Sequence, residues 1–296
     1  MRKSLFVGAL IGAIALTSCD TEHESRQTMP VSMMNYTVTS GGEAYSIGTS
    51  TFTLNYTSPN ESGLRIEGLD FVDANTKVYD FENLTLKSYT EGFSLEPNNT
   101  TTPMPTSLKA TMLLVGNMSY NINMGGNTII GVSLQQTFYS TTVVANAQTG
   151  EQVKRTDDAA YNRFGTLISS KDLNTDKRSL NLYIFSAAFM EGMPSVNMVF
   201  KDVNFAVQRD RLVFSKDELI PEKVNSQNLE NTVPQERFKI TDLAGSITIG
   251  GEGVVSFVCN YEAPTGEVVP FRVQSVLKNN VSQSSSNSNN TNIPNN

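Results

Sequence analysis

Short segments in which apolar and polar residues alternate recur along most of this chain, and turn-forming residues separate them about every ten positions. Val, Ile, Thr, Tyr and Phe are common in these segments, whereas a helical period of apolar residues is rare. The pattern predicts an all-β fold. The predicted strands are Thr51–Ser58, Leu64–Phe71, Lys77–Leu86, Leu108–Val115, Thr128–Leu134, Ser179–Phe185, Val196–Phe205, Arg211–Phe214, Phe238–Ile249, Val254–Tyr261 and Val268–Val276. Pro97–Pro105 and Pro221–Pro234 are rich in Pro and Asn and are expected to be loops.

The two halves of the chain resemble each other weakly, which predicts two tandem, related β-domains of about 120 residues each. Strand, hairpin, long loop and strand follow in the same order in both halves. The alternative is that short alternating strands resemble one another without a common origin. The matched segments are Asp80–Leu86 with Val199–Phe205, Glu91–Leu95 with Asp210–Phe214, Thr51–Ser58 with Ser179–Ser186, and Leu108–Thr111 with Phe238–Thr241.

The first residues are typical of an export signal. Arg2 and Lys3 precede a run of about a dozen apolar and small residues, Leu5–Leu16, which is shorter than the roughly 20 residues that a membrane-spanning helix needs. The run ends in Leu16–Cys19, a sequence that resembles the lipobox of bacterial lipoproteins, in which the cysteine is acylated and becomes the new N-terminus. We therefore expect lipidation at Cys19. The alternatives are an ordinary secretory signal with an incidental cysteine and an uncleaved membrane anchor.

These features predict a domain organisation with five parts. Residues 1–18 form the signal peptide and 19–28 a polar, lipidated tether. The first β-domain covers 29–150 and the second 151–278. Residues 279–296 are almost entirely Asn and Ser, a composition that cannot bury enough apolar surface to fold, and they are expected to be a disordered tail.

Charge and cysteine content narrow the function further. The formal net charge of −7 disfavours binding to a phosphate backbone, so no nucleic-acid partner is expected. Once Cys19 carries lipid, Cys259 is left without a disulfide partner. Alternation in Val254–Cys259 places Cys259 on the apolar face of a strand, where it is expected to be a buried, unreactive thiol.

The scarcity of histidine argues against an enzyme. The one histidine, His23, lies in the predicted tether, so it cannot complete a Ser-His-Asp site, a Cys-His site or a histidine-based zinc site in the folded body. We expect no catalytic residue, no cofactor and no metal. A glycosidase that uses two carboxylates is the remaining enzymatic alternative, with Glu43, Glu67, Asp70 and Glu191 as candidates, but nothing in their spacing selects a pair.

One segment imitates a calcium-binding loop. Asp172–Asp176 carries oxygen ligands at alternate positions, but Lys177 replaces the expected glycine and Tyr183 stands where a bidentate acid would be needed. The segment is therefore interpreted as a turn between strands.

The residues quoted so far are similar to those of one group of proteins. Leu16–Cys19 followed by the acidic Asp20–Glu24 looks like the start of uncharacterised Bacteroidales lipoproteins. Phe189–Pro194 leading into Val196–Phe205, and Phe238–Gly245 leading into Val255–Cys259, are similar to the calycin-like, that is lipocalin-like, domains of that group. The resemblance implies antiparallel β-barrels or strongly curved sheets or sandwiches, and it implies no catalytic residue.

The resemblance and the residues together lead to one expected function and two alternatives. We expect a lipoprotein of the outer membrane, exposed on the cell surface or else on the periplasmic face, that is a non-catalytic binding module for a small apolar or amphipathic ligand. The first alternative is an adhesin or fimbria-like component that pairs with other surface proteins. The second is a protein that binds or acts on glycans. A small-ligand binder needs a closed apolar cavity of roughly 300 Å³ or more, whereas an adhesin has filled cores and exposed edges.

Overall fold

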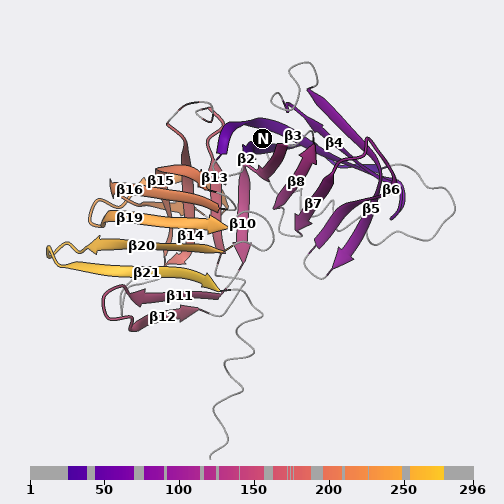
Figure 1. Ribbon diagram of the computed structural model, residues 1–296. Helices are drawn as coiled ribbons and strands as arrows, with labels where there is room; N and C mark the ends of the chain where they lie inside the picture. Colours follow the sequence, from indigo (N-terminus) through magenta and orange to yellow (C-terminus); the bar gives the residue numbers. More distant parts are fainter. Residues whose placement is uncertain are drawn as a thin grey trace, which may run out of the picture.

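The computed structural model describes residues 26–38, 44–69, 77–89, 92–113, 117–124, 127–139, 141–156, 163–171, 173, 175, 177–187, 196–208, 211–225, 227–248 and 254–276. The described residues confirm the expected all-β class, because every helix or strand assigned to them is a strand. The strands form two antiparallel sheets that lie side by side (Figure 1).

The first sheet is a closed barrel of eight strands, β2–β9, which we call the barrel. Each strand pairs antiparallel with the next one in the sequence, and β9 pairs with β2 to close the ring. This up-and-down closure leaves no open edge. The barrel strands are β2 (Val31–Val38), β3 (Ala44–Tyr56), β4 (Ser62–Glu67), β5 (Val78–Tyr89), β6 (Gly92–Thr102), β7 (Ser107–Leu113), β8 (Met118–Met124) and β9 (Asn127–Ser133). The same sheet includes a short ninth strand, β1 (Arg26–Gln27), which pairs with β3.

The second sheet curls into a half-barrel, in the order β10-β13-β14-β15-β16-β19-β20-β21-β11-β12. β10 pairs with β13 and β11 with β21, although a single residue separates β10 from β11 in the sequence. Two peptide units span at most about 7 Å, so the opposite sides of this sheet must curve toward each other. The strands are β10 (Gln135–Tyr139), β11 (Thr141–Asn146), β12 (Gln152–Thr156), β13 (Arg163–Ile168), β14 (Ser179–Ala187), β15 (Val196–Gln208), β16 (Arg211–Leu219), β17 (Glu222–Asn225), β18 (Asn228–Pro234), β19 (Lys239–Thr248), β20 (Val255–Glu262) and β21 (Val268–Val276).

The two sheets repeat the same strand order, as the internal similarity predicts. Asn83 in β5 and Asp202 in β15 occupy matched positions and both have a left-handed backbone, with φ of 57° and 51°. Each lies at a break in the strand register, and Asn and Asp are the non-glycine residues that tolerate this conformation best. The eight-stranded barrel also agrees with the architecture that a calycin-like resemblance implies.

Two of the predicted matches between the halves align segments that are not equivalent in the structure. The counterpart of β14 is β4 and not β3, because β4 pairs with β5 as β14 pairs with β15. In the same way Ala110 pairs with Leu95 and Gly245 with Phe214, so Ala110 corresponds to Gly245 and not to Ile240. Alternating strands have similar sequences whatever their neighbours, so the sequence match does not determine which strands pair.

The barrel and the half-barrel share a hydrophobic core along β2 and β9. Met33 points into the barrel and packs in its core, whereas Met34 and Tyr36 point outward. These outward side chains, with Val132 of β9, are fully buried against the core of the half-barrel. The sheets divide the chain at Leu134, whereas the expected boundary was at residue 150. Because the two sheets share this core, they form one packed unit.

The segment Pro221–Pro234 was expected to be a loop but forms the hairpin β17–β18. Its prolines lie just before the first strand and at the end of the second, where a missing N–H costs no ladder hydrogen bond. The hairpin covers a separate apolar cluster on the outer face of the half-barrel, formed by Tyr183, Phe185, Val199, Val224 and Leu229. The prediction of a loop at Pro97–Pro105 is also partly wrong, because β6 continues to Thr102.

The first described strand, β1, lies inside the expected tether of residues 19–28. Arg26 and Gln27 pair with Tyr56 and Asn55 of β3. The Thr28 N–H donates to the Leu54 carbonyl at 2.9 Å, and the Leu54 N–H donates to the Thr28 hydroxyl at 3.0 Å. The residues before Arg26 and after Val276 lie outside the described residues, so the signal peptide and the disordered tail remain predictions.

Replacing Met34 with alanine should lower the free energy of unfolding by about 2–5 kcal/mol, because this side chain is fully buried in the shared core. Urea denaturation followed by circular dichroism measures the change. Met104→Ala is a matched control: Met104 is 58% exposed, and its loss should change stability by less than about 0.5 kcal/mol. Two separate unfolding transitions in the unmodified protein would contradict a shared core.

Candidate functional site

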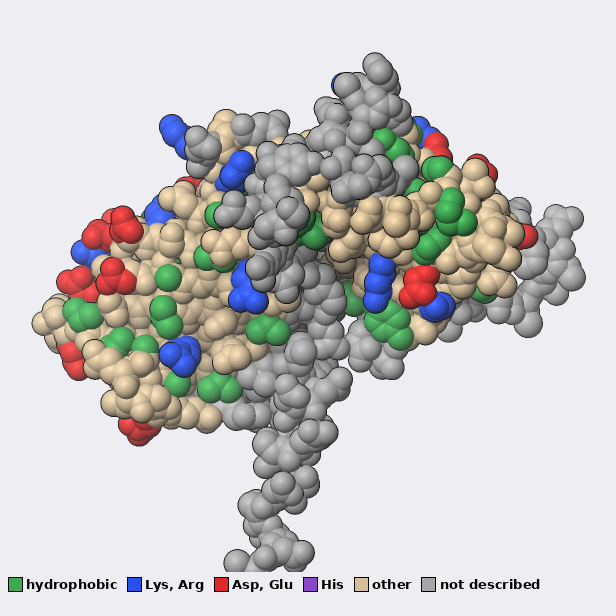
Figure 2. Space-filling model, viewed as in Figure 1, with side chains coloured by type: hydrophobic (Ala, Val, Ile, Leu, Met, Phe, Trp, Pro, Cys, Tyr) green, Lys and Arg blue, Asp and Glu red, His purple; other side chains and the backbone are tan. Residues whose placement is uncertain are grey.

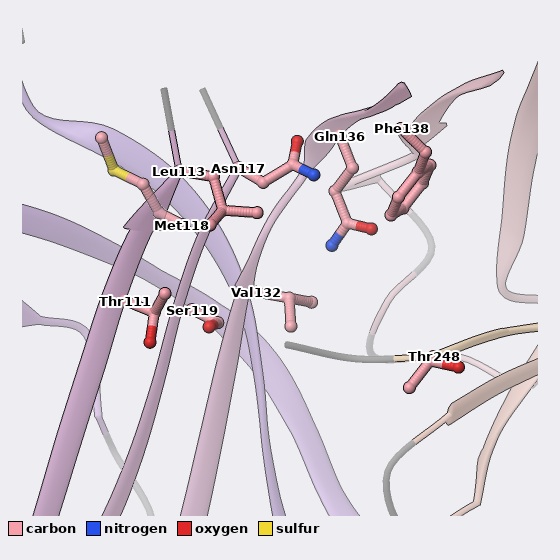
Figure 3. A pocket seen from close by; sticks show the side chains of 9 residues that line it. All are labelled: Thr111, Leu113, Asn117, Met118, Ser119, Val132, Gln136, Phe138 and Thr248. Carbon is pink, nitrogen blue, oxygen red and sulfur yellow. The ribbon is translucent and has the colours of Figure 1, made fainter. Parts of the chain in front are cut away.

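A small pocket lies where the barrel meets the half-barrel (Figure 3). Its volume is about 10 Å³, which is room for about one water molecule. Hydroxyl and amide groups alternate with apolar side chains around it, so it can hydrogen-bond a polar group but cannot enclose a large ligand. The lining residues are Thr111, Leu113, Asn117, Met118, Ser119, Val132, Gln136, Phe138 and Thr248.

Asn117 joins the two sheets at this pocket. Its side-chain Nδ2 donates to the Thr137 carbonyl at 2.8 Å, and the Thr137 N–H donates to Asn117 Oδ1 at 2.6 Å. The amide thus pairs with β10 as a strand backbone would. Next to this contact the Gln136 amide points into the pocket, while Thr248 reaches it from the half-barrel (Figure 3).

The interiors of both sheets are occupied by the protein's own side chains. Phe52 and Phe81 fill one part of the barrel, and Phe200 and Phe257 lie at the centre of the half-barrel, all almost completely buried. Tyr120 lies so close to Gly131 that a Cβ on this glycine would be 2.1 Å from the ring. The described interior is therefore packed and leaves no shaped chamber of the size expected for an apolar ligand.

Tyr120 is one of several polar residues that are buried inside the barrel. Its hydroxyl lies 2.9 Å from the Ser50 hydroxyl, and burial raises the pKa of the phenol. Tyr120 therefore stays neutral in the physiological pH range and can both donate and accept a hydrogen bond. Asn35 and Thr37 of β2 are buried on the same interior face.

The expectation for Cys259 is confirmed. The residue is unpaired and 3% exposed, and burial raises the pKa of its thiol to about 12, so the reactive thiolate is scarce at neutral pH. Cys19, the expected lipidation residue, and His23 lie outside the described residues. Lipidation therefore stays a prediction.

Among the candidate carboxylates only Glu67 is described. It accepts a hydrogen bond from Arg65 at 3.0 Å, and Arg65 also bonds Asp80 at 2.8 Å, in an exposed ion-pair network. Glu43, Asp70 and Glu191 are outside the described residues, as are the three oxygen-bearing side chains of the calcium-like segment at 172, 174 and 176. Within the described ranges, no group of three or more His, Cys, Asp or Glu side chains is placed to hold a metal ion.

The sequence did not predict the polar residues of the junction pocket or those buried inside the barrel. Asn117, Gln136, Asn35 and Thr37 carry no motif and belong to no recognised spacing. One signal in the sequence was the lack of polar–apolar alternation in Met33–Thr37, which the structure explains because all five side chains are buried in a strand that is covered on both faces.

Comparison with known proteins adds little. No protein-family model and no curated protein matches the chain. Among solved structures, a protein of unknown function from the DUF3598 family of Nostoc punctiforme aligns with 83% of this chain and 93% of that chain, at 9% sequence identity and a TM-score of 0.19. A TM-score this low does not identify a shared fold. In the described part of the chain, no helix has the length and apolar character to cross a membrane.

Replacing Asn117 with leucine should lower the free energy of unfolding by about 1–3 kcal/mol, because the Thr137 N–H and carbonyl lose their partners. Thermal and urea unfolding measure the loss. The control is Asn121→Leu, since Asn121 is an exposed residue of β8, the strand that begins directly after Asn117. Equal losses in the two variants would show that the Asn117 contact does not join the sheets.

Proposed function

We propose that this protein is an acylated lipoprotein of the outer membrane that binds another macromolecule through its outer surface. The observation that carries the proposal is the packed interior: the barrel is filled by Phe, Tyr, Met and Leu side chains, and the junction pocket has a volume of only about 10 Å³. An apolar ligand of ordinary size needs roughly 300 Å³ or more. The adhesin or assembly role is therefore favoured over the lipocalin-like role.

Two strand edges support a surface role. Among the described strands, β12 pairs only with β11, and β18 pairs only with β17, so each has one side without a partner strand. Exposed backbone groups on such an edge can accept an extended segment of another chain. The hydrophobic side chains visible in Figure 2 are interspersed with polar ones on this face, which favours recognition through hydrogen bonds over a broad apolar contact.

Native mass spectrometry tests the surface role. Residues 26–276, purified gently from cells of the native type, should give the mass of the bare chain or of a defined protein assembly, and added palmitate should not bind in a one-to-one ratio. The packed interior is the physical reason, since it leaves no volume for the acyl chain. A stoichiometric apolar molecule that persists in the spectrum would overturn the proposal.

The anchor is tested separately, by labelling cells with radioactive palmitate. Cys19→Ala should abolish labelling and move the protein from the membrane fraction to the soluble one, because acyl chains supply the membrane affinity. Cys259→Ala is the matched control, and it should keep full labelling because Cys259 is buried. Labelling that survives Cys19→Ala would contradict acylation at this position.

A further inference from the structure

The outer face of the half-barrel carries two rows of mostly small, uncharged side chains across β15, β16, β19, β20 and β21. Residues paired in register share one face, while alternate residues such as Phe214 and Phe257 are buried in the core. The first row, which we call the Ala206 row, consists of Ala206, Val213, Ser246, Ser256 and Gln274. The second, the Asn204 row, consists of Asn204, Ser215, Ala244, Val258 and Arg272. These side chains are exposed or half-buried, and Arg272 is the one charged residue in the two rows.

The barrel carries charged side chains at the matched positions. The match follows from the register, because β5 pairs with β6 as β15 pairs with β16, and Ala110 corresponds to Gly245. The barrel has Lys87, Glu96 and Lys109 where the half-barrel has Ala206, Ser215 and Ala244. Lys87 and Glu96 form an ion pair, as is common on a sheet face that meets water. The half-barrel keeps the same strand register without these charges, which indicates a face made for contact with another surface.

Charged groups lie at the ends of the strands that carry this face. Arg211 begins β16 and Asp217 lies near its end, three residues to either side of Phe214. On the side of the half-barrel shown in Figure 2, acidic side chains gather near the turn between β20 and β21, and the area over β16, β19 and β20 is mostly uncharged. A centre poor in charge with a charged rim is the usual anatomy of a protein interface.

The face complements itself. A two-fold axis that crosses the strands at Phe214 and Gly245, midway between the rows, lays the Ala206 row of one copy on the Asn204 row of another. The same rotation brings Arg211 over Asp217 of the second copy, so opposite charges meet at the rim. The small side chains in the centre let the two sheets approach closely.

The size of the face fits a dimer of moderate affinity. Five strands and the seven residues from Arg211 to Asp217 measure roughly 24 Å in each direction, or about 600 Å² per copy. A standard stable interface buries about 800 Å² per partner. We therefore expect a reversible dimer and not a permanent one.

We propose that this outer face binds a second copy of the chain in the two-fold arrangement. The proposal rests on the surface role proposed above and names one partner for it. It uses the face of the sheet and leaves the open edges of β12 and β18 free. Binding of other chains at those edges does not depend on the dimer.

Cross-linking of the full chain in intact cells of the native type tests the dimer. Val258→Cys should give a cross-linked dimer with a short, membrane-permeant bismaleimide, because Val258 is 37% exposed and lies beside the axis. Asn121→Cys is the matched control, since Asn121 is exposed at the corresponding barrel position, and it should give no dimer above background. The native Cys259 does not interfere, because its thiol is buried.

Charge variants in the Val258→Cys chain test the face itself. Ala244→Lys copies Lys109 of the barrel and should lower the dimer yield about tenfold, because a lysine in the centre would lose its hydration. Ser215→Glu, which copies Glu96, should do the same. Thermal unfolding of both variants should match that of Val258→Cys alone, since the barrel carries these charges at matched positions.

A charge swap tests the two-fold arrangement. Arg211→Asp and Asp217→Arg should each lower the dimer yield, and the two changes together should restore it, because the opposite charges then meet again across the axis. A double variant that stays as weak as the single ones would overturn this arrangement.

Three results would overturn the dimer. The first is a yield from Val258→Cys no higher than that from Asn121→Cys. The second is an unchanged yield in folded Ala244→Lys and Ser215→Glu chains. The third is a cross-link from Val258→Cys to a different protein in place of a second copy. None of these results bears on palmitate binding, so a failure of the dimer is distinguishable from a failure of the surface function.

Discussion

Burial of β2 and β9 on both faces is the constraint on which the rest of the structure depends. One face of β2 closes the barrel through Met33, and the other face, with Met34 and Tyr36, supplies part of the core of the half-barrel. A curled sheet with an uncovered concave side would expose its Phe-rich interior to water. The barrel wall covers that side, so two related sheets form one stable body.

Much of the fold could be predicted from the sequence, because most strands keep one face buried and therefore alternate. The β5 and β15 segments were matched correctly, and the structure adds the reason, a shared left-handed residue at Asn83 and Asp202. β2 was missed because burial of both faces removes alternation from Met33–Thr37. The β17–β18 hairpin was missed because its prolines are typical of loops.

The candidate sites were harder to predict, since they depend on residues brought together by barrel closure. Asn35 and Gly131 are adjacent only because β9 returns to β2, and Asn117 meets Thr137 only because β10 belongs to the other sheet. Whether the barrel encloses a binding chamber could not be predicted from the sequence for a similar physical reason: residue types that line a cavity also fill a core, and only packing distinguishes the two. Cys259 was predictable because one strand pattern determines its burial.

The path of the chain through the half-barrel sets an order of assembly. β11 is followed directly by β12, but its partner on the other side, β21, is the final described strand, more than a hundred positions later in the sequence. A chain that emerges N-terminus first can complete the barrel early, whereas β11 must wait for β21. Until then β11 lacks its pairing with β21, and that edge of the strand is open to other chains.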